Sequence, residues 1–298
     1  NKIILLLIRY LNGFKNIIQH IKEKGWFDRL FDYSWDEPTV AEYTKVKERT
    51  DLIKAADPAI PRQITLRFTP ELEGYVTRWT PQINDILAHT TQIARGVSYP
   101  DSAVYETRKM LGEQVWWYQA CGNVGCYIEG KEYTQGWPNF AIEYSSMTNR
   151  IFQWMTYKYR MQGELYFTVD YAYGRYGAMN GVKVELAESL LYFGGNGDGT
   201  LYYPGRPAEI GGATHIPLES IRLKLIREGY EDYEYLRAAR LASGSDTLID
   251  AKVNSLITNT FTWKDDPTLL YQLRQELAEI AAGTSTITRD APKGVTVQ

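Results

Sequence analysis

The 298-residue chain has few of the residues that bind transition metals or form disulfides. It contains two cysteines, Cys121 and Cys126, and three histidines that lie far apart in the sequence. Zinc-ligand spacing is therefore not met, and we predict no metal site and no cofactor. The cysteine pair could form a small-loop disulfide or remain as two free thiols, so it does not decide the cellular compartment.

A long hydrophobic run is also missing. The apolar stretch at 3–8 is too short for a membrane span, is interrupted by Arg9 and Asn12, and is not followed by a small-residue cleavage site. Apolar residues continue after it at helical spacing, which predicts one amphipathic helix that ends at Gly25. We predict no membrane span and no signal peptide in this chain, although a periplasmic or secreted location remains plausible.

Charge of one sign does not dominate the sequence. The 33 lysines and arginines balance 36 aspartates and glutamates to a net charge of -3, and the basic residues are scattered. Nucleic acid is therefore not an expected partner, because no basic stripe exists to neutralise phosphates. A hydrophobic content of 44% predicts a globular protein with one large core or two modest ones.

Aromatic residues, in contrast, are abundant. The chain has 23 tyrosines, 8 tryptophans and 9 phenylalanines, and many of them gather at 116–118, 154–159, 166–176 and 202–203. Tyrosine and tryptophan combine an apolar face with a polar tip, which suits stacking against sugar rings while their hydroxyls are hydrogen-bonded. A carbohydrate site would use this composition; alternatively, most of these rings fill the core.

The tetrapeptide Trp35-Asp36-Glu37-Pro38 places two adjacent carboxylates after an aromatic stretch that reads as a strand. Proline removes a backbone donor and fixes φ, so the strand must stop there, with Glu37 at its carboxyl end. In barrel enzymes that end carries the chemistry. The alternative is that Asp36 or Thr39 only caps the helix that follows.

Strands and helices are predicted to alternate along most of the chain. The strand candidates lie at 27–36, 61–68, 74–79, 114–120 and 163–171, and the helices between them at 40–56, 81–93, 106–112 and 141–160. Alternation of this kind, with long loops after the strands, indicates a parallel α/β fold. We predict a (β/α)8 TIM-like barrel. Five strands are visible rather than eight, so either the barrel is incomplete at its N-terminus or the other strands are supplied elsewhere.

The C-terminal third is predicted to be helical. A strong helix at 218–241 precedes two further helices at 247–258 and 267–281. We therefore predict barrel units over 1–242, helices packed on the barrel over 243–283 and a mobile tail over 284–298.

Four motifs resemble the catalytic domain of glycoside hydrolase family 123, also known as domain of unknown function 4091. They are Trp35 to Pro38, Trp116 to Tyr118, the glycine-rich Asn196 to Gly205, and Ser220 to Leu236. The resemblance spans roughly residues 15 to 242 and covers the later part of the family's barrel, from the helix before strand four onward. The first three strand-helix units are not found and the chain begins at Asn1, so we expect a fragment or a processed product.

The resemblance implies a retaining β-N-acetylgalactosaminidase that uses the substrate's own 2-acetamido group as nucleophile. Glu37 would be the general acid/base, and Asp36 would orient and polarise the acetamido N–H. Tyr118 would support the acetamido carbonyl, and Trp116 or Trp117 would form a pocket wall.

Weaker candidates for the glycan site are Asn139, Asp170 and Tyr171, at loop and strand ends on the same side. A conventional retaining glycosidase would need a second carboxylate about 5 Å from Glu37. The strand at 114–120 ends without an acid, which favours substrate assistance, although Asp170 could stand in. Further alternatives are a glycosidase of different sugar specificity and a catalytically inactive carbohydrate-binding or structural barrel fragment. The sequence does not indicate the oligomeric state.

Overall fold

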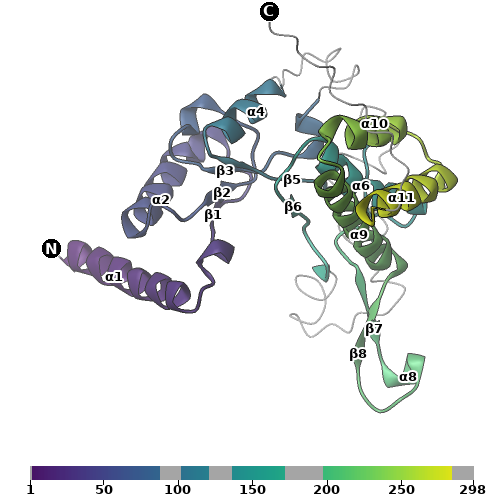
Figure 1. Ribbon diagram of the computed structural model, residues 1–298. Coiled ribbons are helices and arrows are strands. Elements are labelled where there is room, and N and C mark those ends of the chain that lie inside the picture. The colour runs from purple at the N-terminus through teal and green to yellow at the C-terminus, as the bar shows by residue number, and fades with distance from the viewer. Residues whose placement is uncertain (1, 88–101, 121–135, 172–196, 284–298) are drawn as a thin grey trace, which may run out of the picture.

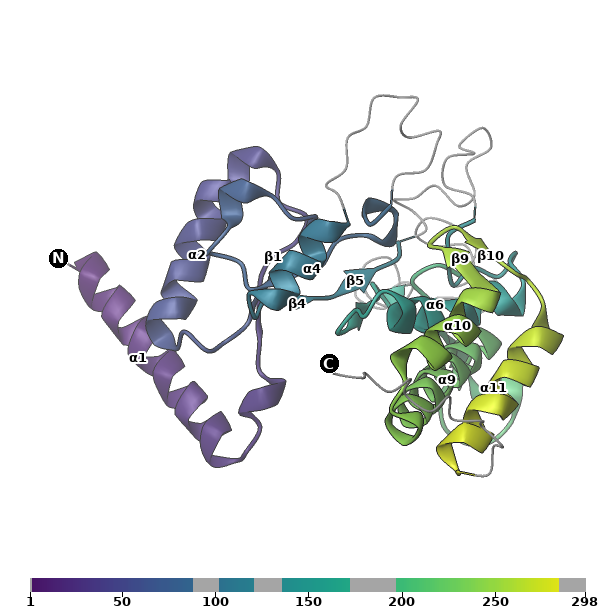
Figure 2. The same ribbon diagram turned by 45° about the horizontal axis from the view of Figure 1, so that its top comes forward.

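The computed structural model of the protein describes residues 2–87, 102–120, 136–171 and 197–283, with side chains from residue 12 onward. Cys121, Cys126, most of the loop at 121–140 and the tail at 284–298 lie outside the described residues. Figures 1 and 2 show two groups of helices, one at each end of a row of short strands.

A parallel sheet forms the middle of the molecule. Its strands run in the order β1-β2-β3-β4, and all three pairings are parallel. After Trp116 the chain continues as a further strand, β5, which pairs in parallel with β6. The strands are β1 (Asp32–Trp35), β2 (Arg62–Ile64), β3 (Arg78–Trp79), β4 (Gln114–Val115), β5 (Trp117–Tyr118) and β6 (Glu164–Leu165).

This sheet agrees with the predicted α/β fold, and a complete barrel is not confirmed. Within the described residues β1 pairs with β2 alone and β6 pairs with β5 alone, so the sheet is open and does not close on itself. Each predicted strand is present in a shorter form. Because all these strands are parallel, their carboxyl ends lie along one edge, and the segments that follow them can share a site.

Of the helices at the N-terminal end, α2 (Tyr43–Ala56) and α4 (Ala103–Met110) pack against the sheet and α1 (Lys2–Glu23) packs against α2. The short 3-10 turns here are η1 (Phe27–Arg29), η2 (Val40–Glu42), η3 (Pro70–Leu72) and η4 (Ile83–Asp85). Val46 of α2 packs with Ile64 and Trp79 of the sheet in a buried cluster. The Thr39 side chain and Glu42 form a capping box that starts the α2 region.

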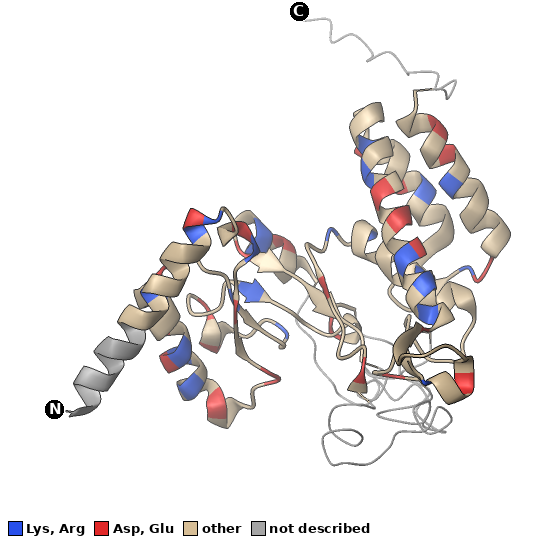
Figure 3. Ribbon diagram, turned by 90° about the horizontal axis from the view of Figure 1, so that it is seen from below, with Lys and Arg blue, Asp and Glu red and all other residues tan. Residues whose placement is uncertain are grey.

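The helices at the C-terminal end form a bundle. They are α6 (Ser146–Lys158), α9 (Ile221–Ser243), α10 (Asp246–Leu256) and α11 (Pro267–Ala281), and Ser145, Ser220, Ser245 and Asp266 cap their N-termini through side-chain oxygens. Asp232 is fully buried in α9 and accepts hydrogen bonds from Arg150 and from Trp154 Nε1. Basic and acidic residues are interspersed along this bundle (Figure 3).

Two antiparallel hairpins were not predicted from the sequence. One joins β7 (Tyr202–Gly205) and β8 (Ile216–Glu219), with the short helix α8 (Pro207–Ile210) between them, and projects from the body of the molecule (Figure 1). The other joins β9 (Ile257–Asn259) and β10 (Thr262–Trp263). Prolines inside both strands of the first hairpin hide its strand pattern.

Other predicted elements have mixed outcomes. The predicted helix at 81–93 is the single turn η4 where it is described, and its remainder lies outside the described residues. The predicted division into 1–242, 243–283 and 284–298 stays a prediction. In the described part of the chain, every helix is too short or too polar to cross a membrane.

Candidate active site

Asp36 and Glu37 follow β1 directly, at the edge of the sheet where the parallel strands end. Both are exposed, so a ligand can reach them, whereas Pro38 is buried. Glu37 has a φ of 42°, in the left-handed region that a side chain other than glycine rarely adopts. Strained conformations of this kind concentrate at functional sites. The other described non-glycine residue with positive φ, Arg160, lies just after the end of α6, where helices ordinarily adopt it.

The Asp36 carboxylate is held from two strands. Its Oδ1 atom accepts a hydrogen bond from the Tyr33 hydroxyl at 2.6 Å and from the Thr65 hydroxyl at 2.8 Å. Tyr33 belongs to β1, and Thr65 follows β2. Burial, together with the neighbouring Asp36 carboxylate, raises the pKa of Tyr33, so this hydroxyl remains a donor.

Thr65 also fixes the backbone of the second acid. The Glu37 backbone N–H donates to Thr65 Oγ1 at 2.8 Å. One buried threonine therefore contacts the side chain of Asp36 and the main chain of Glu37. The two acids have a common support and keep a defined relative position.

The Glu37 carboxylate is oriented by two other residues, Gln82, which follows β3, and Tyr118, the last residue of β5. Its Oε1 atom accepts a hydrogen bond from the Tyr118 hydroxyl at 2.6 Å and from Gln82 Nε2 at 3.4 Å. Gln82 also donates to the Tyr118 hydroxyl at 3.0 Å. Burial and the adjacent Glu37 carboxylate raise the pKa of Tyr118, which keeps its proton on the oxygen.

The structure thus brings together three predicted site residues, Asp36, Glu37 and Tyr118. Tyr118 lies against Glu37 rather than against Asp36. Sequence reasoning missed Thr65, Gln82 and Tyr33. Thr65 follows β2 and Gln82 follows β3, on the sheet edge that carries the acids. Their position after a predicted strand was the signal that could have identified them.

The two predicted tryptophans lie in different surroundings. Trp117 is fully buried, stacks on Phe152 of α6 and donates from Nε1 to Thr156. This ring packs in the core, and its role as a pocket wall stays a prediction. Trp116 is partly exposed, and its ring lies over the Arg78 guanidinium at 4.2 Å. Its contact with a glycan stays a prediction.

Asn139 is also a structural residue. It is 1% exposed, and its Oδ1 atom accepts a hydrogen bond from the backbone N–H of Ala141. Its carbonyl accepts from Asn149 of α6. These contacts fix the entry to α6, and a substrate-binding role of Asn139 stays a prediction.

Asp170 and Tyr171 lie in the segment after β6. Asp170 is exposed and forms an isolated antiparallel bridge with Thr200, and the Tyr171 backbone N–H donates to the Gly199 carbonyl. Arg222 holds this glycine-rich turn through the carbonyls of Gly197 and Thr200. These contacts give the glycine-rich turn a structural role. A glycan-binding role of Asp170 or Tyr171 stays a prediction.

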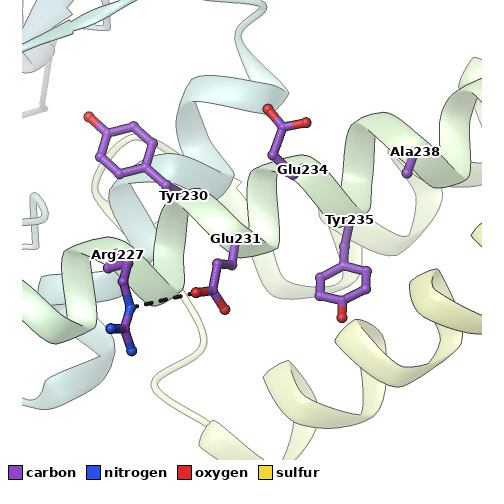
Figure 4. Close-up of a pocket in the computed structure, with 6 residues that line it drawn as sticks. All are labelled: Arg227, Tyr230, Glu231, Glu234, Tyr235 and Ala238. Atoms are coloured by element: carbon purple, nitrogen blue, oxygen red, sulfur yellow. Dashed lines mark ion pairs between the residues drawn. The ribbon is translucent and has the colours of Figure 1, made fainter.

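A hollow of about 580 Å³ lies along α9, and the described residues that line it all belong to that helix. Figure 4 shows Tyr230 and Tyr235 on this face and the ion pair between Arg227 and Glu231, which is 3.5 Å long. None of its lining residues follows a strand, so this hollow is separate from the acids of the sheet edge. Across the described ranges, no cluster of three or more histidine, cysteine, aspartate or glutamate side chains could hold a metal ion.

Comparison with known proteins adds the following. The model of the glycoside hydrolase 123 catalytic domain matches residues 7–239. Among solved structures, a family 123 glycoside hydrolase from Clostridium perfringens, described for the hydrolysis of glycolipid glycans, aligns with a TM-score of 0.53 at 15% identity. The alignment covers 94% of this chain and 44% of that one, and at this identity it speaks for the fold alone. No curated protein matches the chain.

Proposed function

The chain belongs to glycoside hydrolase family 123, and we propose that it is a retaining, substrate-assisted glycosidase that removes terminal β-linked 2-acetamido sugars, N-acetylgalactosamine first among them. The observation that carries this proposal is the shared support of the two acids. Thr65 contacts both Asp36 and Glu37, and Tyr118 orients the Glu37 carboxylate. Adjacent acids held in this way can act on two atoms of one sugar.

In this mechanism Asp36 acts on the acetamido group. Tyr33 and Thr65 both donate to its Oδ1 atom, which leaves Oδ2 to accept the acetamido N–H of the substrate. A carboxylate at this position stabilises the positive charge that grows on the acetamido group as its carbonyl oxygen attacks the anomeric carbon. The exposure of Asp36 lets the substrate approach.

Glu37 transfers the proton. As the acetamido oxygen bonds to the anomeric carbon, the bond to the leaving oxygen breaks and that oxygen takes the Glu37 proton. Water then attacks the anomeric carbon of the cyclic intermediate and gives a proton back to Glu37, so the configuration is retained. Hydrogen bonds from Tyr118 and Gln82 hold the carboxyl group in place through both steps.

The open sheet favours one alternative from another class, a carbohydrate-binding domain without catalysis. Within the described residues the strands run from β1 to β6 and do not close into a barrel. Such a domain would bind a glycan and leave it intact, so turnover separates the two functions.

The decisive experiment measures release of nitrophenol from β-N-acetylgalactosaminide and β-N-acetylglucosaminide. We expect turnover by the wild type, with kcat lower by about 10² to 10⁴-fold in Glu37→Gln because general acid catalysis is lost. We expect kcat of Asp36→Asn to fall by a similar factor. Glu48→Gln, an exposed acid on α2, is the matched control and should keep wild-type activity.

A second substrate tests the participation of the acetamido group. A β-galactoside with a 2-hydroxyl in its place should not be cleaved, whereas an enzyme with its own nucleophile would cleave it. Equal inertness of the folded wild type and both acid variants on all substrates would contradict the proposed function.

A further inference from the structure

A cavity of about 470 Å³ begins at Pro38, the residue after Glu37. Its walls come from the segments that follow β1, β2 and β3, so it opens on the same edge of the sheet as the two acids. The lining residues are Pro38, Thr39, Val40, Tyr43, Leu66, Arg67, Phe68, Thr69 and Asp85. Its volume lies within the roughly 300 to 1,000 Å³ of small-molecule sites.

Two opposite charges face this cavity. Burial raises the pKa of the Asp85 carboxyl to about 6, the charge of Arg67 acts against this rise, and the charge of Glu37 adds to it. The three groups therefore lie within electrostatic reach of one another. The 3-10 turn η4 links Asp85 to Glu37. The Asp85 backbone N–H donates to the carbonyl of Gln82, and the Gln82 side chain donates to Glu37.

The remaining walls combine rings and hydroxyls. Phe68 is held by an edge contact with Trp79 at 5.0 Å and lies under the Arg108 guanidinium at 4.7 Å. Tyr43 stands on the first turn of α2. Aromatic faces beside a carboxylate, a guanidinium and threonine hydroxyls match a ligand with apolar ring faces and many hydroxyls.

We propose that this cavity is the subsite for the leaving-group side of the glycan, and that Arg67 and Asp85 hydrogen-bond the hydroxyls of the sugar released when the terminal residue is cleaved. The inference rests on the proposed function. It follows from position, because the glycosidic oxygen that receives the Glu37 proton must belong to a group that lies next to Glu37. A sugar there would be held by a cation and an anion with defined hydrogen-bond directions.

The test compares two substrates with the same terminal 2-acetamido sugar, one linked to nitrophenol and the other linked to a second sugar. Nitrophenol has no sugar hydroxyls for Arg67 and Asp85 to bind. We expect kcat/KM of Asp85→Asn and of Arg67→Met to fall at least about tenfold more on the disaccharide than on the nitrophenyl substrate, the factor that 1.4 kcal/mol of lost binding gives. Glu48→Gln should change neither value.

A third variant, which blocks the cavity by its size, keeps the test informative if Asp85→Asn or Arg67→Met does not fold. Val40 is 77% exposed at the rim of the cavity, so Val40→Trp should fold and should hinder the disaccharide more than the nitrophenyl substrate. Equal losses on both substrates in all three variants would overturn the inference and leave the proposed function intact. A wild type inert on both substrates would overturn the proposed function and the inference with it.

Discussion

At the scale of single residues, Asp85 shows how the sheet edge affects a side chain. Its carboxyl group is enclosed by η4 and the segment after β2, and this burial disfavours its ionised form. A residue of this kind lowers the stability of the folded chain when it is charged. Sites that bind polar ligands often contain such a group.

The pH dependence of unfolding tests this effect. Burial raises the pKa of Asp85 to about 6 in the folded chain, above its value of about 3.9 when unfolded, so the folded state holds the proton more tightly. The contribution of Asp85 to the free energy of unfolding should therefore fall as pH rises from 4 to 6. Relative to wild type, Asp85→Asn should gain about 2 to 3 kcal/mol at pH 7 and almost nothing at pH 4 in urea unfolding.

The exposed Asp28→Asn is the control for the removal of one carboxyl group from the surface. A pH-independent difference for Asp85→Asn would show that its carboxyl group titrates normally in the folded chain.

Site residues that are placed by the local sequence could be predicted, whereas those placed by strand pairing could not. Asp36 and Glu37 are neighbours before a proline, and that local pattern is visible in the sequence. Thr65 contacts both acids only because β2 pairs with β1 in one register, which includes a shift between Tyr33 and Trp35. Trp117 lies in the core on the same side as Val115, two residues earlier in the chain.

At the scale of elements, α6 and α9 approach each other closely at Gly229. A Cβ atom at this position would lie 2.8 Å from the Arg150 carbonyl oxygen of α6 and would also overlap the end of the Gln153 side chain. The glycine is helical, so the reason for it is space rather than backbone conformation. Gly13 of α1 offers a direct comparison, because nothing lies within 4 Å of its would-be Cβ.

Alanine at the two helical glycines should therefore have opposite effects. Gly13→Ala should raise the free energy of unfolding by up to about 1 kcal/mol, since alanine favours the helix. Gly229→Ala should lower it by about 1 to 3 kcal/mol, because the helices must separate to admit the methyl group. Chemical denaturation of both variants measures the two changes, and a gain in stability at position 229 would contradict the close approach of α6 and α9.

Most helices could be predicted, and several strands could not. The helix at 221–243 begins at a serine cap and ends at Gly244 in the left-handed conformation, so the signals for its two ends are local. The unpredicted strands, β7 to β10 of the two hairpins, have only two to four residues each, too few to show a period. A complete barrel is not confirmed in the described residues, because alternation of strands and helices specifies parallel pairing but not the number of strands.

At the scale of the whole molecule, the open sheet presents an aromatic face. Asp32 pairs with Arg49 of α2, so its neighbours Phe31 and Tyr33 point to the other face, where they are 39% and 42% exposed. The Arg78 guanidinium lies over the Phe31 ring at 4.6 Å and is also covered by Trp116. Exposed aromatic rings beside a strand edge favour association between molecules.

Sedimentation velocity over a wide range of protein concentration tests this face. We expect the wild type to associate, and Phe31→Ser to weaken the association about tenfold, since it removes a ring from the contact. Met110→Ser, at a methionine that is 80% exposed on α4, is the matched control and should associate as the wild type does. If Phe31→Ser associates as strongly as the wild type, this aromatic face does not form the contact between molecules.

The left-handed backbone of Glu37 sets a limit on how this protein can be improved. Glycine at position 37 would relax that conformation, so a screen that selects only for heat resistance would favour Glu37→Gly. The same replacement would delete the carboxyl group on which catalysis is proposed to depend. Thermostability and turnover are therefore in direct conflict at this codon, and engineers who seek a hardier enzyme should hold it constant.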